Sequence, residues 1–70
     1  MTAATATHRL TGLVAEQAAI MAQLDALAIE CKAADDATYD RLSRQMNRLE
    51  GQAIGVTARI QTVRRQTQTA

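Results

Sequence analysis

The sequence predicts an all-α fold, an antiparallel two-helix hairpin that assembles into a helical bundle, either a dimer or a higher symmetric oligomer. Three observations support this fold class: two long runs of apolar residues at helical spacing, a short polar segment between the runs, and the absence of proline from all 70 residues. Proline interrupts helices, so its absence favours long ones. A chain of this length forms a single domain, which we assign to residues 1–70.

The first helix is predicted over about residues 7–33. Apolar residues recur there at alternating steps of three and four, which is typical of a helix packed along its whole length. The stripe consists of Leu10, Leu13, Ile20, Leu24, Leu27 and Cys31, with Gln17 as its polar member and Val14, Met21 and Ala28 on one flank.

The second helix is predicted over about residues 38–66, after a turn at about residues 34–37. Asp35, Asp36 or Thr38 can accept hydrogen bonds from the free N–H groups at the start of this helix. Its apolar stripe is unbroken and consists of Tyr39, Leu42, Met46, Leu49, Ala53, Val56, Ile60 and Val63.

A turn this short makes the two helices antiparallel neighbours. Pairing positions whose numbers sum to about 70 places Cys31 beside Tyr39 and Gln17 against Ala53. A buried amide without a partner costs about 1–3 kcal/mol. Gln17 therefore predicts either a hydrogen bond to its counterpart in another subunit or a small cavity that admits a ligand.

The composition predicts that the hairpin needs partner subunits. A chain this short buries only about 60% of its unfolded surface. The single cysteine, Cys31, cannot form an intramolecular disulfide, and the single aromatic residue, Tyr39, leaves an aliphatic core. The predicted oligomer contacts lie behind the two stripes and are Gly51, Ile54, Gly55 and Ala58 on the second helix, and Ala15, Ala22 and Ile29 on the first.

Gly51 and Gly55 are the strongest of these contact signals. Each costs a helix about 1 kcal/mol relative to alanine, and small residues four apart let another backbone approach closely. The alternatives are that the glycines only make the helix pliable, and that the alanines are simply good helix formers.

Basic residues gather at the end of the predicted hairpin where both termini lie. Repeated in an oligomer, they predict a patch that binds a small anionic ligand at a subunit junction. The alternative is that they only complement the negative end of a helix dipole. The candidate ligand-binding residues are Gln17, Arg9, Arg59, Arg64 and Arg65.

The residues offer little to a catalytic mechanism. The only histidine, His8, and the only cysteine, Cys31, lie on one predicted helix about 35 Å apart, too far for a nucleophile and its base. No phosphate-binding glycine loop or metal-ligand spacing is present. The sequence therefore predicts no enzyme, no metal and no cofactor.

The sequence also predicts a cytoplasmic protein without membrane contact, since we find no signal peptide and no apolar run of about 18 residues.

Residues 48–56, Arg-Leu-Glu-Gly-Gln-Ala-Ile-Gly-Val, resemble the first-helix signature of the copper-sensing repressor family, with Leu42 and Met46 in phase. The resemblance implies helical oligomers in which Cys and His on the following helix bind metal. No Cys or His follows residue 56 in this sequence, so no metal ligand carries over. In size and shape the chain is also similar to phage-encoded hairpin proteins that sequester cyclic nucleotide signals.

The leading functional prediction is a non-enzymatic oligomeric binding module. It would be a phage or mobile-element regulator or inhibitor that sequesters a small anionic, cyclic-nucleotide-like ligand or a protein partner. One alternative is a small nucleic-acid-binding regulator, which needs its basic residues on one continuous face. Another is a structural subunit that holds an assembly together.

Overall fold

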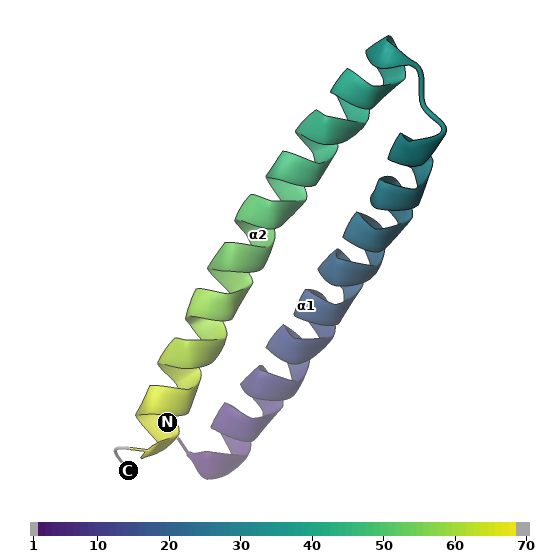
Figure 1. Ribbon diagram of the computed structural model, residues 1–70. Coiled ribbons are helices and arrows are strands. Elements are labelled where there is room, and N and C mark those ends of the chain that lie inside the picture. Colours follow the sequence, from purple (N-terminus) through teal and green to yellow (C-terminus); the bar gives the residue numbers. More distant parts are fainter. Residues whose placement is uncertain (1, 69–70) are drawn as a thin grey trace.

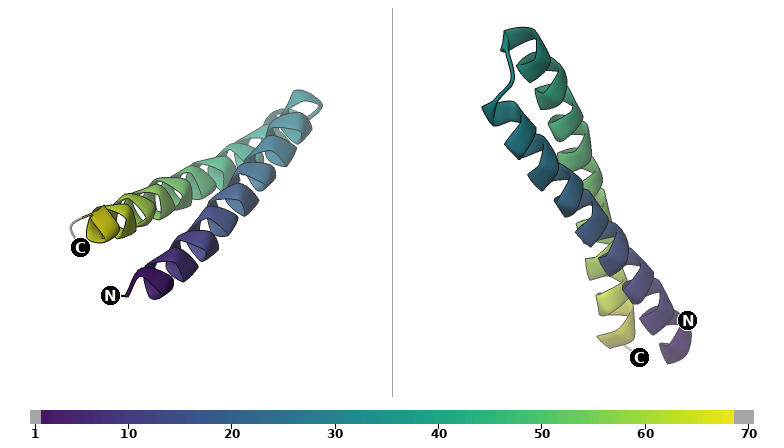
Figure 2. Two further views of the ribbon diagram at one scale, coloured as in Figure 1. Left: turned by 90° about the horizontal axis from the view of Figure 1, so that it is seen from below. Right: turned by 90° about the vertical axis from the view of Figure 1, so that its right-hand side faces the viewer.

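The computed structural model describes residues 2–68 and consists of two long helices side by side. Helix α1 spans Ala3–Lys32 and helix α2 spans Asp36–Gln68, and they run antiparallel with both chain ends at the same end of the molecule (Figure 1). The two further views show no third layer, so each helix is covered only by the other (Figure 2). The hairpin is 52 Å long and only 14 by 12 Å across. The predicted all-α hairpin is confirmed.

Both helices begin earlier than predicted because polar side chains cap them. Thr2 Oγ1 accepts the N–H of Thr5 at 3.2 Å, so α1 begins at Ala3 instead of about residue 7. Asp35 Oδ1 accepts the N–H of Thr38 at 2.8 Å, so α2 begins at Asp36 instead of about residue 38. Helix α2 also continues to Gln68, beyond the predicted end at about residue 66. Residues 1, 69 and 70 of the assigned domain lie outside the described residues.

The core is a single thin seam between the helices. Ile20 of α1 and Val56 and Ile60 of α2 form its buried centre, with aliphatic residues of both predicted stripes packed around them. The buried apolar residues are Ala6, Ile20, Leu42, Val56, Ile60 and Val63, and Val56 is buried completely. The stripes therefore face each other as predicted, but they bury few side chains completely.

The register of the two helices differs from the prediction by four to seven residues, which is one to two helical turns. Gln17 contacts Thr57 rather than Ala53, and the Cys31 thiol lies 3.8 Å from the sulfur of Met46 rather than beside Tyr39. Helix α2 begins beyond the end of α1, and residues 33–35 continue past the end of α1 to reach its first turn (Figure 1). The first turn of α2 therefore overhangs, and Tyr39 is 52% exposed. The predicted pairing of Cys31 with Tyr39 is wrong.

Helix α1 is more apolar than the sequence analysis recognised. By length and composition alone it could cross a membrane, because an 18-residue window in it holds no more than two charged residues. The expectation that no segment meets this test is wrong, since alanines extend the apolar stretch between Glu16 and Asp25. Only 11% of that window is buried in the hairpin, so α2 covers little of the apolar surface of α1.

Candidate functional site

One hydrogen bond between side chains joins the two helices near the middle of the seam. Gln17 Nε2 donates to Thr57 Oγ1 at 2.9 Å. The sequence predicted that this amide pairs with its counterpart in another subunit or lines a ligand cavity, but in the structure its partner is Thr57 of the same chain. The residues beside this bond and the residues on the opposite side of the hairpin differ in polarity.

Exposed apolar side chains flank the Gln17–Thr57 bond on both helices. Val14 and Met21 lie three residues before and four residues after Gln17, so they are its neighbours on the surface of α1. Ile54 lies three residues before Thr57 and neighbours it on α2 in the same way. Val14 is 46% exposed, Met21 49% and Ile54 72%. We call these three residues the apolar face.

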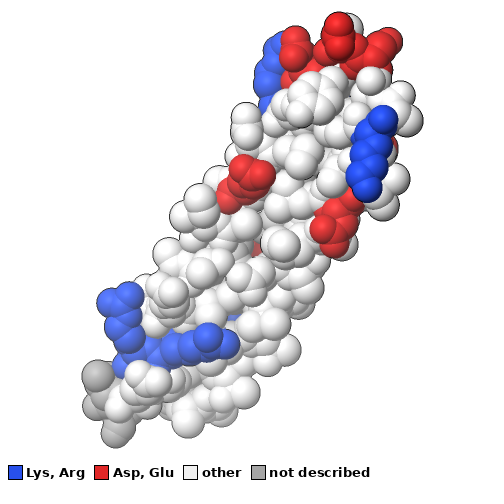
Figure 3. Space-filling view, viewed as in Figure 1, with Lys and Arg blue, Asp and Glu red and all other residues white. Residues whose placement is uncertain are grey.

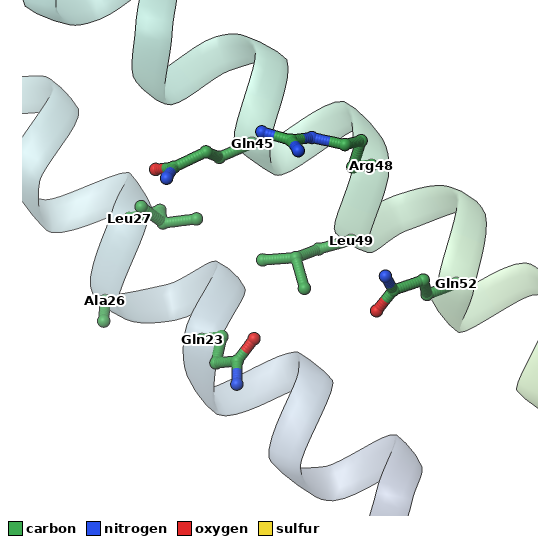
Figure 4. A pocket seen from close by; sticks show the side chains of 7 residues that line it. All are labelled: Gln23, Ala26, Leu27, Gln45, Arg48, Leu49 and Gln52. Carbon is green, nitrogen blue, oxygen red and sulfur yellow. The ribbon is translucent and has the colours of Figure 1, made fainter.

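The opposite side holds a hollow of about 460 Å³ between the helices. Its residues are Gln23, Ala26 and Leu27 of α1 and Gln45, Arg48, Leu49 and Gln52 of α2, and we call this set the polar groove (Figure 4). The two leucines form an apolar floor. The side chains of Gln23, Gln45 and Gln52 lie around these two leucines, so amide groups border the apolar floor (Figure 4).

The polar groove offers hydrogen bonds and one positive charge. Each glutamine amide can both donate and accept, and a guanidinium can bind a carboxylate or phosphate through two parallel hydrogen bonds. Within residues 2–68, Arg48 has no hydrogen-bond or ion-pair partner. The groove can therefore bind a group with a planar polar edge and an anionic substituent. In the same range no three His, Cys, Asp or Glu side chains lie close enough together to hold a metal ion.

The candidate ligand-binding residues of the sequence analysis do not converge on one surface. Residues seven apart share one side of a packed helix. Arg59 is seven residues from Gln52 and Arg9 is fourteen from Gln23, which places both arginines on the side of the polar groove. Arg64 is seven residues from Thr57, which places it on the side of the apolar face.

Of the two remaining candidates, Gln17 is engaged with Thr57, and Arg65 follows Arg64 at the terminal end of α2. On the side shown in Figure 3, the charged side chains at the terminal end are basic, those of the half nearer the turn are both acidic and basic, and a broad uncharged surface lies between the two groups. The continuous basic face that a nucleic-acid regulator needs is therefore not formed by Arg9, Arg59 and Arg64 together.

The predicted oligomer contacts also lie on more than one side. Ala15, Ala22 and Ile29 recur every seven residues on the surface of α1 that faces away from α2, and Ile29 is 69% exposed. Gly51 and Ala58 lie on the corresponding outer surface of α2, whereas Ile54 belongs to the apolar face. A Cβ added at Gly51 or Gly55 would meet nothing within 4 Å, so close packing inside the hairpin does not require these glycines.

Sequence reasoning missed the polar groove. Part of the polar groove could have been predicted, because Gln45 and Gln52 are seven residues apart and therefore lie on the same side of the apolar stripe, beside Leu49. Finding Gln23 opposite them required the register, which the sequence did not supply.

Comparison of the chain with protein-family models, with curated proteins and with solved structures finds no match in any of the three.

Proposed function

We propose that this chain is a non-enzymatic binding module whose hairpins associate into a helical bundle. The apolar face would be covered in the assembly, and the polar groove would remain open to a small anionic ligand or to an acidic segment of a partner protein. The observation that carries the proposal is the difference between two sides of the hairpin: one exposes the three residues of the apolar face, and the other is lined by amides and Arg48.

The exposed area supports self-association. The hairpin exposes 5170 Å², whereas a compact monomeric protein of 7.6 kDa exposes about 4,300 Å². The excess of about 900 Å² is close to the roughly 800 Å² that each partner contributes to a stable protein–protein interface. Covering one side of each hairpin would bring the chain to the exposure of an ordinary folded protein.

The polar groove supports ligand binding. Its amides and Arg48 suit a compact anion with a planar polar edge, such as a cyclic nucleotide, whose base would lie over Leu27 and Leu49. Arg9 and Arg59 lie on the same side of the hairpin, toward the terminal end, and would add a positive potential that attracts anions.

Self-association is tested by sedimentation equilibrium of the full chain and a pair of matched variants. The variant Val14→Glu/Met21→Glu places two charges on the apolar face, and Ala15→Glu/Ala22→Glu places two charges at the same spacing on the outer surface of α1. We expect the wild type to be an oligomer, the first variant to be a monomer and the second to match the wild type. A monomeric wild type would overturn the proposal, and disruption by the second variant alone would move the interface to the outer surface of α1.

Ligand binding is tested by calorimetric titration with a cyclic dinucleotide and with inorganic phosphate. Arg48→Gln should weaken binding of the dinucleotide about tenfold or more, because it removes a charge-assisted pair of hydrogen bonds. Arg44→Gln, an equal change at an exposed position of α2, should leave binding unchanged. The absence of binding to either compound would remove the small-ligand function and leave the protein-partner function.

A further inference from the structure

We infer that the apolar face is covered by a second copy of this chain, packed in the opposite end-to-end direction about a two-fold axis at the level of the Gln17–Thr57 bond. The inference rests on the proposed self-association and adds the surface, the orientation and the residue pairs. The resulting dimer is a four-helix bundle in which α1 packs on α1 and α2 packs on α2, each pair antiparallel.

The position of the apolar face along α1 is compatible with a two-fold symmetric contact. In a symmetric dimer the same patch contacts itself after rotation, so it must match its own inverted copy. Gln17 is near the middle of α1, and Val14 and Met21 lie on either side of it. Rotation about an axis at this level brings Val14 of one copy against Met21 of the other, and both side chains are about half exposed in the single hairpin.

The same rotation pairs opposite charges on α2. Glu50 and Arg64 lie seven residues before and seven residues after Thr57, so they share its side of the helix and are equally far from the axis. Inverting one copy places Glu50 against Arg64 of the other, and symmetry makes this pair twice. Both side chains are exposed, and within residues 2–68 neither has a partner of its own.

The alternative orientation, with the two turns at the same end, sets like charges together. In that arrangement α1 of one copy lies on α2 of the other at equal levels. Asp25 lies about 12 Å from Gln17 toward the turn, and Glu50 lies about 10 Å from Thr57 in the same direction. These two carboxylates would therefore meet, and the basic terminal ends would also lie together. Charge complementarity selects the inverted dimer.

A second copy fits this face better than a membrane does, although α1 is long and apolar enough to enter one. Helices that lie on membranes carry Lys and Arg beside their apolar surface, because phospholipid surfaces are commonly anionic. Here two acidic residues, Asp25 and Glu50, and only one basic residue, Arg64, border the apolar face. An inverted copy supplies Arg64 to Glu50, whereas an anionic lipid surface supplies only further negative charge.

Charge reversal at Glu50 and Arg64 tests the orientation through the dimer dissociation constant, measured by sedimentation equilibrium. Glu50→Arg and Arg64→Glu should each weaken the dimer about five- to thirtyfold, because two symmetric pairs are lost. The double variant Glu50→Arg/Arg64→Glu restores both pairs and should return the constant to near the wild-type value. Glu16→Arg makes the same charge change seven residues from Gln23, on the side of the polar groove, and should have no effect. Circular dichroism of each variant verifies that the hairpin is folded.

The outcomes separate this inference from the proposed function. A dimer that is strengthened by Glu50→Arg would have the turns at the same end, and a dimer that is indifferent to both single variants would use another face. Either result overturns the inference and leaves self-association standing. A wild-type chain that is monomeric and sediments with vesicles of anionic or zwitterionic phospholipid would overturn both and assign the apolar face to a membrane.

Discussion

Asp35 determines where α2 begins. Its carboxylate accepts the N–H of Thr38 and its carbonyl accepts the N–H of Tyr39, both at 2.8 Å. Hydrogen bonds from Thr38 hold the pKa of the Asp35 carboxyl below the ordinary value of 3.8, because they favour the charged form, and attraction by Arg41 acts in the same direction. The sequence predicted a cap among Asp35, Asp36 and Thr38, and the structure selects Asp35.

This cap should make the stability of α2 depend on pH in the acid range. A carboxyl whose pKa is lowered by folding stabilises the fold above its unfolded pKa, and the contribution is lost as the pH falls through the lowered value. Asp35→Ala should therefore reduce the thermal midpoint by a few degrees at neutral pH, and the difference from wild type should shrink well below pH 3.8. Circular dichroism melts across this range measure it. Asp35→Asn keeps an acceptor that does not titrate, and a difference for Asp35→Ala that persists unchanged in acid would contradict the assignment.

For Gln17 the sequence predicted the need for a hydrogen bond but not the residue that satisfies it. Its place in an apolar stripe predicted that its amide needs a hydrogen bond, because an unpaired buried amide is costly. The partner depended on which residue of α2 lies nearby, and the shift in register replaced Ala53 with Thr57. The chemical need was local and predictable, whereas the identity of the partner was a property of the register.

At the scale of the helices, the stripes were predictable because they depend only on spacings of three and four residues along one chain. The register depends on the path of residues 33–35, which carry no turn motif that fixes one geometry. Because α2 overhangs α1, Tyr39 lies outside the seam and the opposing pairs shift along its length. The polar groove escaped prediction for the same reason, since its residues come from both helices.

The glycines of α2 give a test at this scale. Gly51 and Gly55 lie inside the helix, and a Cβ at either position would meet nothing within 4 Å. Gly51→Ala and Gly55→Ala should each raise the free energy of unfolding by about 1 kcal/mol, because alanine is the better helix former. Gly12→Ala makes the same change in α1, where the surroundings are equally open, and serves as the comparison in urea unfolding. A loss of stability at Gly51 or Gly55 but not at Gly12 would show that another backbone packs there, as the spacing of the glycines suggested.

At the scale of the whole molecule, the stability of the hairpin should depend on its concentration. Its core contains few fully buried side chains, so the proposed second copy would supply much of the apolar burial that keeps the chain folded. For a dimer of this size, each tenfold rise in concentration should raise the thermal midpoint by about 5 °C. The variant Val14→Glu/Met21→Glu should melt at a lower temperature that does not change with concentration, while Ala15→Glu/Ala22→Glu should retain the dependence of the wild type. Calorimetry over a hundredfold range of concentration measures both. A wild-type midpoint that is the same at every concentration would mean that the thin seam between α1 and α2 suffices by itself, and that the apolar face contributes nothing to folding.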